Sequence, residues 1–467
     1  MPGSRPVAMS DTLMISVSGM RGHVGTDLTP ELVARHAAAL GSWARGAQRP
    51  AGSDRPAVVL GRDARTSGPM FTHAAMAGLM SVGVDVIDVG VVPTPTVQLA
   101  VEYHHAGAGL ILTASHNPIE WNALKFVGPD GVFLGADAGA RVRALAESGP
   151  PREGWDGLGI VREDREAIAR HLDLVLALPL IDVAAIRARR FHVAVDCVRG
   201  AGGTTIPLLL ERLGCRMSAI NLETDGRFPR SPEPVPENLG DLERLVRESG
   251  ADIGFAVDPD VDRLAIVDET GRAIGEDYTL AFAVAAVLDQ RTRAETPVVV
   301  VNLSTSLVVE DAARAGGARF VRAPVGEANV AQAMRDEGAL IGGEGNGGVM
   351  LPALHIGRDA PLGVALILHR LARSASTVSG MVAAAPRYSI VKAKGPRGVA
   401  LEPLFDQLTR RFADATVDRR DGLRLAWLDR WLHVRPSGTE PIVRFIAEAP
   451  TQSEAAALVA AGRALTS

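Results

Sequence analysis

The sequence lacks three features, and each absence excludes a class of protein. It has only two cysteines in 467 residues, too few for a disulfide scaffold, so we expect a cytoplasmic protein in a reducing compartment. No run of about 18 apolar residues occurs, so we expect no membrane-spanning helix. The net charge is −5 and no polybasic run occurs, so we expect neither nucleic acid nor an anionic membrane surface as a partner.

Lysine is scarce as well. The sequence has 49 lysines and arginines together, but lysine occurs only at Lys125, Lys392 and Lys394. The arginine excess fits either the base composition of the gene or a preference for the planar, bidentate contacts of guanidinium groups with anions. Lys125 therefore stands out as a candidate for a specific role.

The chain does have length and a repeated pattern. A chain of 467 residues is too long for one hydrophobic core and predicts about three or four domains. A short β-branched run, a glycine-rich turn and an Ala/Leu-rich stretch follow one another three times, which is typical of α/β units. The first strands of these units are expected at 57–60, 193–196 and 298–301.

The last part of the chain has a different pattern. Strands are expected there with two helices, at 388–394, 423–428, 431–434 and 443–447. We therefore predict three similar mixed-sheet α/β domains and a C-terminal α+β domain around a central cleft. The predicted domain ranges are 1–152, 153–272, 273–380 and 381–467.

A candidate nucleophile follows an apolar strand at residues 109–112. Residues 113–118 read Thr-Ala-Ser-His-Asn-Pro, which places Ser115 beside His116 in a loop closed by Asn-Pro. A hydroxyl at the carboxyl end of a strand is well placed for group transfer, because open α/β sheets bind ligands there. Taken alone, the same residues also fit an ordinary turn.

A candidate metal loop lies at residues 258–263, Asp-Pro-Asp-Val-Asp-Arg. Its three alternating carboxylates, Asp258, Asp260 and Asp262, can converge on one hard cation such as Mg²⁺. An EF-hand is excluded because Arg263 occupies the position that needs glycine and the flanks are expected to be strands. A solvated acidic turn stays open as the alternative.

Two further loops have chemistry suited to a sugar phosphate. Residues 342–348, Gly-Gly-Glu-Gly-Asn-Gly-Gly, let the backbone approach a ligand, and Glu344 and Asn346 can pair with vicinal hydroxyls. Residues 435–441, Arg-Pro-Ser-Gly-Thr-Glu-Pro, can surround a phosphate, and Arg444 can add a further contact. Each of these segments taken alone also fits a structural turn.

Together the four loops, one in each expected domain, resemble those of the α-D-phosphohexomutase superfamily, which includes phosphoglucomutases, phosphomannomutases and phosphoglucosamine mutases. Shorter matches extend the resemblance over nearly the whole chain: 18–22 (Ser-Gly-Met-Arg-Gly), 61–65 (Gly-Arg-Asp-Ala-Arg), 93–95 (Pro-Thr-Pro) and 225–229 (Asp-Gly-Arg-Phe-Pro). The Ser115 and Arg435 loops are the most specific matches, and the glycine-rich loop is the least specific.

The resemblance implies roles for the residues of the first two loops. Ser115 would carry a phosphoryl group in the resting enzyme, and Mg²⁺ would be bound by the phosphoserine and the three aspartates, with Arg263 placed to help. Arg21, His116 and Lys125 would complete the catalytic group. Lys125 is the candidate acid or base, since a lysine among cations can have a lowered pKa.

The resemblance also implies a reaction and its ligands. The sugar would be held by Glu344 and Asn346, and the phosphate by Arg435, Ser437, Gly438, Thr439 and Arg444. The phosphoryl group would move between C6 and C1 through a hexose 1,6-bisphosphate, which also acts as activator. We expect a monomer or homodimer that converts glucosamine 6-phosphate to glucosamine 1-phosphate. The alternatives are a broad phosphomannomutase/phosphoglucomutase, a metal-dependent phosphatase and a non-catalytic sugar-phosphate sensor.

The chain departs from the common family pattern at two loops. Many bacterial members read Gly-Glu-(Met/Gln)-Ser-Gly-His in the sugar loop, whereas this chain has Asn346 for the serine and Gly348 for the histidine. The metal loop has Pro259 and Val261 where glycine is frequent, but its three aspartates are present. The first departure leaves the preferred sugar open.

Overall fold

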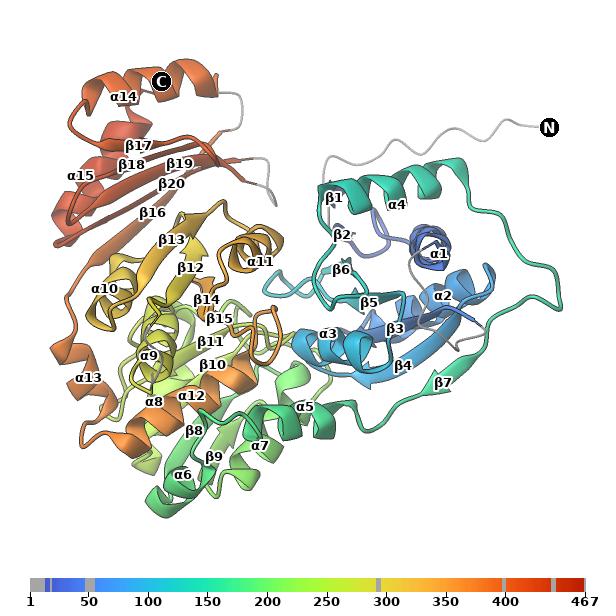
Figure 1. Ribbon diagram of the computed structural model, residues 1–467, viewed down its shortest axis with the longest axis horizontal. Helices are drawn as coiled ribbons and strands as arrows, with labels where there is room; N and C mark the ends of the chain where they lie inside the picture. Colours follow the sequence, from blue (N-terminus) through green and yellow to red (C-terminus); the bar gives the residue numbers. More distant parts are fainter. Residues whose placement is uncertain are drawn as a thin grey trace. The chain divides into compact units, whose positions relative to one another are not determined.

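The computed structural model describes residues 13–16, 19–46, 55–290, 295–396, 400–437 and 442–465. Its helices and strands are labelled in Figure 1. Within these ranges the strands form four sheets, of seven, four, four and five strands. None of the helices in these ranges combines the length and the apolar character that crossing a membrane requires.

The chain divides into two compact units. The first contains Met1–Ala177, Val195–Leu242 and Ala256–Asp262, and the second contains Leu178–Ala194, Glu243–Phe255 and Arg263–Ser467. The Ser115 loop and the three aspartates therefore belong to the first unit. The glycine-rich and Arg435 loops belong to the second.

The first sheet combines parallel and antiparallel strands in the order β1-β2-β6-β5-β3-β4-β7. Its parallel members β5, β3, β4 and β7 adjoin an antiparallel group made of β6, β2 and β1. The strands are β1 (Met14–Ser16), β2 (Gly19–His23), β3 (Ala57–Arg62), β4 (Asp85–Val91), β5 (Ala108–Leu112), β6 (Trp121–Val127) and β7 (Val161–Glu163). The helices of this region are α1 (Pro30–Arg45), α2 (Gly68–Met80), α3 (Thr94–Tyr103) and α4 (Ala136–Ser148).

Helices α1, α2 and α4 share one apolar core with this sheet. Leu40 of α1 and Phe71 of α2 are fully buried in it with Leu110 of β5. Helix α1 begins where it does because the Thr29 hydroxyl accepts a hydrogen bond from the Leu32 N–H at 3.4 Å and a proline follows the cap. Strand β5 is buried along its whole length, as expected for a parallel strand covered on both faces.

The second sheet has the order β11-β10-β8-β9, with β8, β10 and β11 entirely buried. Its strands are β8 (His192–Asp196), β9 (Arg216–Ile220), β10 (Ile253–Val257) and β11 (Leu264–Val267). The nearby helices are α5 (Ala167–Leu176), α6 (Val183–Arg189), α7 (Ile206–Arg212), α8 (Gly240–Ser249) and the 3₁₀ turns η1 (Ala201–Thr204) and η2 (Pro236–Asn238). The predicted metal loop is the connection between β10 and β11.

The third sheet has the order β13-β12-β14-β15, with β15 antiparallel and the other strands parallel. Its strands are β12 (Val298–Asn302), β13 (Arg319–Ala323), β14 (Ile341–Glu344) and β15 (Gly348–Met350). Its helices are α9 (Asp277–Leu288), α10 (Leu307–Ala315), α11 (Glu327–Asp336), α12 (Ala360–Arg373) and α13 (Val378–Ala384).

The structure differs from the expectation at the glycine-rich segment. We expected a loop over 342–348, but most of this segment belongs to the hairpin of β14 and β15. A Cβ at Gly343, whose φ is +154°, would lie 2.1 Å from the Gly348 carbonyl oxygen, so the hairpin needs glycine there. Glycine carries no side-chain pattern, and this is why the alternation typical of a strand could not be seen.

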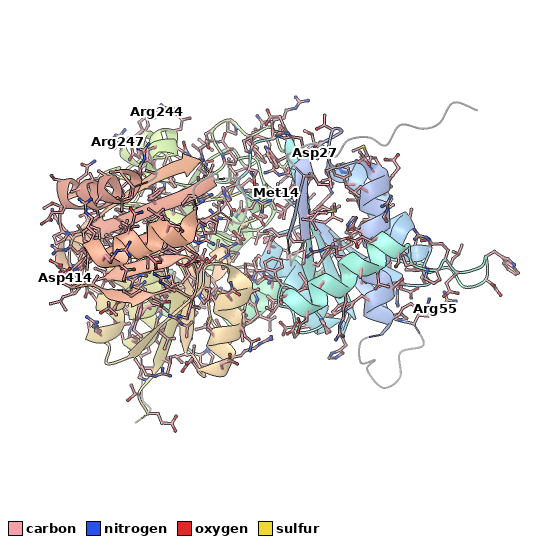
Figure 2. The ribbon with its side chains drawn as sticks, turned by 90° about the horizontal axis from the view of Figure 1, so that it is seen from above. Met14, Asp27, Arg55, Arg244, Arg247 and Asp414 are labelled. Atoms are coloured by element: carbon pink, nitrogen blue, oxygen red, sulfur yellow. The ribbon has the colours of Figure 1, made fainter. Side chains whose placement is uncertain are left out.

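The fourth sheet is antiparallel throughout, in the order β16-β20-β19-β18-β17. Its strands are β16 (Ser389–Pro396), β17 (Thr416–Asp418), β18 (Leu423–Ala426), β19 (Trp431–Pro436) and β20 (Ile442–Ala449). Helices α14 (Leu401–Arg411) and α15 (Gln452–Arg463) contribute Leu404 and Leu458 to its core. Asp414, labelled in Figure 2, accepts a hydrogen bond from the Trp427 indole N–H at 2.8 Å and ties the segment after α14 to the β18–β19 turn.

Candidate active site

Ser115 lies in the loop between β5 and β6 and is only 3% exposed. Its φ of +49° lies in the left-handed region, which few residues other than glycine adopt. Its hydroxyl donates a hydrogen bond to Asp258 Oδ2 at 2.7 Å. His116 Nδ1 lies 3.4 Å from the hydroxyl oxygen of Ser115. The structure thus places the predicted nucleophile against the first residue of the predicted metal loop.

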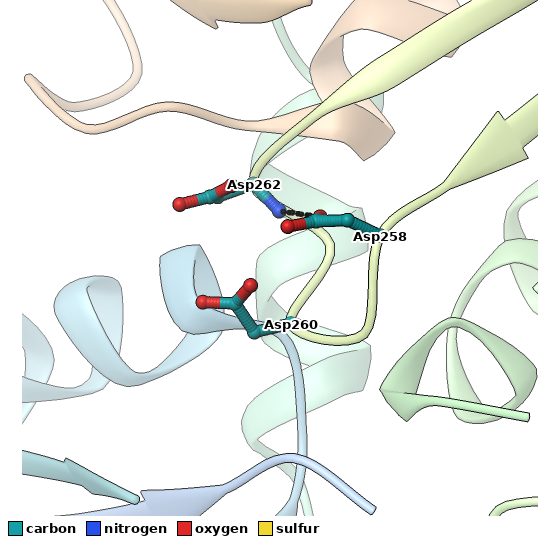
Figure 3. A group of neighbouring side chains, drawn as sticks. All are labelled: Asp258, Asp260 and Asp262. Atoms are coloured by element: carbon teal, nitrogen blue, oxygen red, sulfur yellow. Dashed lines mark hydrogen bonds between the residues drawn. The ribbon is translucent and has the colours of Figure 1, made fainter. Parts of the chain in front are cut away.

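The three aspartates converge from one turn, with their carboxylates on the same side of the loop (Figure 3). One oxygen from each lies within 4.8 Å of the others, and all three side chains are buried. Asp258 Oδ1 accepts a hydrogen bond from the Asp262 N–H at 3.2 Å, and the left-handed Val261, with φ +61°, reverses the chain between them. The start of α3 holds the turn, because Thr94 donates to the Asp260 carbonyl at 2.8 Å and to its Oδ2 at 2.7 Å.

The donor set fits a hard divalent cation. Asp260 Oδ1 is buried and accepts no hydrogen bond in the described structure, so one carboxylate oxygen is left for a ligand. Burial raises the pKa of Asp260, but the Lys125 ammonium and hydrogen bonds outweigh that effect, and its pKa falls below the usual range. A buried group of three carboxylates, whose donor atoms are all oxygen, is the kind of site that Mg²⁺ occupies.

The other predicted catalytic residues surround the same loop. Lys125, on β6, places its Nζ 2.7 Å from Asp260 Oδ2 and 3.7 Å from Asp262 Oδ2. Arg21, on β2, donates to the Asn117 side-chain oxygen at 2.5 Å. Thus Arg21, His116 and Lys125 all contact either the nucleophile loop or the carboxylates. Arg263 follows Asp262 in the chain, and its positive charge acts on Glu344.

In the second unit, Glu344 ends β14 and is 4% exposed. Its Oε1 accepts hydrogen bonds from Asn302 Nδ2 at 2.8 Å and from the Gly326 N–H at 3.0 Å. Its Oε2 pairs with Arg358 at 2.8 Å. Burial raises the pKa of Glu344, but Arg358 and these hydrogen bonds outweigh it, so the pKa lies below the usual range and the carboxylate is ionised near neutral pH.

Arg358 occupies the space that a side chain at Gly348 would need. It also pairs with Glu327 at 3.0 Å, so its guanidinium joins two buried carboxylates. A Cβ at Gly348 would lie 2.3 Å from Arg358 Cδ and 3.2 Å from Asn346 Oδ1. Asn346 Oδ1 is buried and accepts no hydrogen bond in the described structure, so it is an available acceptor in the hairpin turn.

Gly348→Ala is expected to lower the free energy of unfolding by about 1–3 kcal/mol, because the methyl group forces the Arg358 stem away from its two partners. Chemical denaturation measures this change. Gly135→Ala is the matched control, since a Cβ there meets nothing within 4 Å and the φ of −76° suits any residue. Equal stability of Gly348→Ala and the wild type would show that the Arg358 stem moves without cost.

A chain of contacts links this hairpin to the fourth sheet. Next to Gly326, which donates to Glu344, the Val325 N–H donates to Asp421 Oδ2 at 3.0 Å. The same Asp421 oxygen accepts from Arg435 Nε at 2.8 Å. Gly326 has φ +122°, which explains a glycine at this position. The predicted sugar and phosphate residues of the second unit are therefore joined through one short backbone segment.

The predicted phosphate residues lie at the adjoining ends of β19 and β20. Arg435 and Arg444 are register partners, and Arg444 Nε donates to the Ser437 hydroxyl at 3.2 Å. Two arginines and a hydroxyl in this arrangement suit a phosphate. Gly438 and Thr439, the other two predicted residues, lie outside the described residues.

His433, on β19, is fully buried in the same region. Its Nδ1 lies 2.8 Å from the Ser304 hydroxyl and its Nε2 lies 2.7 Å from the Asp421 carbonyl oxygen. Burial lowers its pKa to about 4. The imidazole is therefore neutral at pH 7 and connects the fourth sheet to the segment after β12.

This lowered pKa predicts a loss of stability in acid. As the pH falls from about 6.5 to about 4, the unfolded chain binds a proton at His433 that the folded chain does not. The free energy of unfolding should fall on the order of 3 kcal/mol across that window. His433→Gln should remove this part of the pH dependence. Unfolding curves of both proteins from pH 7 to pH 4 test it, and parallel curves would contradict the prediction.

Sequence reasoning missed several residues that contact the predicted site residues. It assigned no role to Asp63, Arg65, Thr94, Asn302, Glu327, Arg358 and Asp421. The available signals were the segments 61–65, Gly-Arg-Asp-Ala-Arg, and 93–95, Pro-Thr-Pro, both noted above as motifs. The others act through partners far away in the sequence, which a local pattern does not reveal.

The chain is similar to known proteins over nearly its whole length. Family models of phosphoglucomutase/phosphomannomutase α/β/α domains I, II and III match residues 13–152, 169–271 and 275–388, and the model of the C-terminal domain matches 396–464. A "phosphoglucomutase/phosphomannomutase" of Thermococcus kodakarensis is 37% identical over 443 residues, which are 94% of each chain. A "probable phosphoglucosamine mutase" of Methanopyrus kandleri is 36% identical, again over 94% of each chain.

A solved structure shares the architecture. The phosphoglucomutase/phosphomannomutase family protein of Burkholderia thailandensis superimposes with a TM-score of 0.81 at 27% identity, covering 95% of this chain and 96% of its own. All four domain models of one family match in order along the chain. The chain therefore belongs to the phosphoglucomutase/phosphomannomutase family, in the α-D-phosphohexomutase superfamily of phosphohexose mutases.

Proposed function

We propose that the protein moves a phosphoryl group between C6 and C1 of a hexose phosphate, with Ser115 as the phosphoryl carrier. The observation that carries the proposal is the hydrogen bond from the Ser115 hydroxyl to Asp258, at the edge of a buried group of three carboxylates. Such a group can hold Mg²⁺, which, when bound, would neutralise charge on the oxygens of a transferring phosphoryl group.

Each half of the reaction uses the same oxygen. The Oγ–P bond of phosphorylated Ser115 breaks as the free sugar hydroxyl bonds to phosphorus, and the hydroxyl proton passes to a base near the loop. The resulting 1,6-bisphosphate reorients. The O–P bond of its other phosphate then breaks as Ser115 Oγ bonds to that phosphorus, and the released sugar oxygen takes the proton back from the base. Lys125 and His116 are the candidates for moving the proton, because Lys125 lies beside the carboxylates and His116 Nδ1 lies 3.4 Å from Ser115 Oγ.

Residues of the second unit suit the other groups of a hexose phosphate. The acceptor oxygens of Glu344 and Asn346 suit the sugar hydroxyls, while Arg435, Ser437 and Arg444 suit the phosphate that is not reacting. A phosphate site that accepts either end of the bisphosphate explains why one enzyme can act on both positions. A phosphatase would need no such site, so the mutase is the better proposal.

For the sugar, we propose glucosamine 6-phosphate and glucosamine 1-phosphate as the preferred pair. Relatives named as probable phosphoglucosamine mutases support this choice. Mannose and glucose phosphates are the second candidate. The name of the Thermococcus kodakarensis relative favours them. The ion pairs of Arg358 favour them as well, because the carboxylates of Glu327 and Glu344 already pair with this arginine and are poor partners for the ammonium group of glucosamine.

Initial rates with Mg²⁺ and the matching bisphosphates would test both levels of the proposal. The substrates would be the 1-phosphates of glucosamine, mannose and glucose, each detected as its 6-phosphate. A 100-fold preference in kcat/KM for glucosamine, about 2.7 kcal/mol, would support the amino-sugar enzyme. Similar rates on all three would support the second candidate, and release of free phosphate as the main product would overturn the mutase.

A further inference from the structure

We infer that Arg65 is the positioning residue that holds Ser115 in its left-handed conformation, acting with Asp63 and Thr113. This inference rests on the proposed function for its consequence in catalysis. Arg65 lies beyond β3, and its side chain is 0% exposed. Its hydrogen bonds to the loop go to backbone carbonyl groups, including that of Ser115, so we assign it a positioning role.

All five N–H donors of the Arg65 guanidinium have partners. Four of the hydrogen bonds go to backbone carbonyl oxygens: those of Ser115, Asn117 and Pro118 in the nucleophile loop, each at 2.6 Å, and that of Trp121, the first residue of β6, at 2.8 Å. The fifth goes from Nε to Asp63 Oδ2 at 3.1 Å. One planar group thus binds three carbonyl groups of the loop and the first carbonyl group of the strand that follows it.

Asp63 and Thr113 fix the other side of Ser115. The Ser115 N–H donates to Thr113 Oγ1 at 2.9 Å, and the Thr113 hydroxyl donates to Asp63 Oδ2 at 2.7 Å. The N–H and the C=O of Ser115 are therefore both tied to one buried ion pair. This arrangement over-determines a backbone conformation that would otherwise cost roughly 1–3 kcal/mol.

The ion pair is itself packed in place. The Phe228 ring lies 5.0 Å from the Arg65 guanidinium. The neighbouring Gly226, with φ +68°, lies so close that a Cβ would be 2.2 Å from the Ala64 carbonyl oxygen. The segment around Gly226 therefore packs against the backbone and the guanidinium of Arg65, and the position of Ser115 depends on contacts from three separate parts of the chain.

Lysine cannot replace this arginine, because an ammonium group has three donors and no planar fork. In Arg65→Lys we expect kcat to fall about 10- to 100-fold with KM within about threefold of the wild type. We also expect hydrogen exchange of the backbone amides in peptides covering 113–121 to become at least about tenfold faster. Arg170→Lys is the control, because Arg170 also combines an ion pair, with Asp164, and an aromatic contact, with Tyr103.

Thr113→Val gives a second, smaller change that keeps the arginine. If both residues act through the Ser115 backbone, the double variant should lose less activity than the product of the two single losses. Independent, multiplicative losses would overturn the inference, and so would unchanged exchange of the 113–121 amides in Arg65→Lys. If the wild type shows no mutase activity but the 113–121 amides still exchange faster in Arg65→Lys, Arg65 positions Ser115 and the proposed function is rejected.

Discussion

Ser115→Ala is expected to lower mutase turnover by at least about a thousandfold while the protein stays folded. The substitution removes the oxygen that would carry the phosphoryl group, which in the structure donates a hydrogen bond to Asp258 of the aspartate group. The loss of one hydrogen bond to Asp258 costs stability only on the order of 1 kcal/mol. Coupled-enzyme rates and thermal unfolding of the same preparation separate these two effects.

The matched control is Ser148→Ala, at the end of α4, where the hydroxyl bonds only to the Leu145 carbonyl oxygen in the described structure. It should retain full activity. Mass spectrometry adds a direct measurement: wild-type protein incubated with a hexose 1,6-bisphosphate should gain one phosphoryl group on the peptide that contains Ser115, and the variant should gain none. Turnover by Ser115→Ala at more than about a tenth of the wild-type rate would reject Ser115 as the carrier.

The sequence could predict the two candidate loops of the first unit because their chemistry is local. Ser115 follows a buried strand directly, and the three aspartates occupy alternate positions of one turn, so each motif is complete within a few residues. The β-branched runs likewise predicted β3, β8 and β12, since a strand buried on both faces is a continuous apolar run.

The supporting residues could not be predicted in the same way. Arg65 reaches carbonyl groups about fifty positions further along the chain, and which carbonyls gather around it depends on how β3, β5 and β6 pair. Arg358 joins Glu344 to Glu327, an arrangement fixed by the packing around β14 and α11. Strand β2 was missed because its sequence, Gly-Met-Arg-Gly-His, has no apolar alternation.

The Arg358 contacts also give a physical account of a departure in sequence. Many resembling loops carry histidine where this chain has Gly348, and the space next to Gly348 is filled by the stem of Arg358. The side chain of a histidine at position 348 would clash with the side chain of Arg358 in this fold. The small size of Gly348 is therefore matched to the presence of Arg358, and this cation next to the hairpin of β14 and β15 comes from the segment before α12.

Removing divalent metal is expected to have an effect second only to loss of Ser115. Treatment with EDTA should lower activity by at least about a hundredfold, and Mg²⁺ should restore it, because three buried carboxylates meet beside Ser115, the proposed phosphoryl carrier. Asp260→Asn should weaken Mg²⁺ binding at least about tenfold, because it removes the negative charge of the Asp260 carboxylate. The Oδ1 of that carboxylate is buried and accepts no hydrogen bond in the described structure.

Binding can be measured without turnover. In the wild type, Mg²⁺ at about 100 times its Kd should add about 2.7 kcal/mol to the free energy of unfolding, and Asp260→Asn should lose most of that gain at the same concentration. Asp137→Asn, an exposed acidic residue in the first turn of α4, should keep it. An equal gain in wild type and Asp260→Asn would place the metal elsewhere. Lys125 pairs with Asp260, so Asp260→Asn also removes an ion pair from the metal-free protein. The stability of metal-free Asp260→Asn should therefore be compared with that of metal-free Lys125→Met, which removes the same pair and leaves all three carboxylates in place.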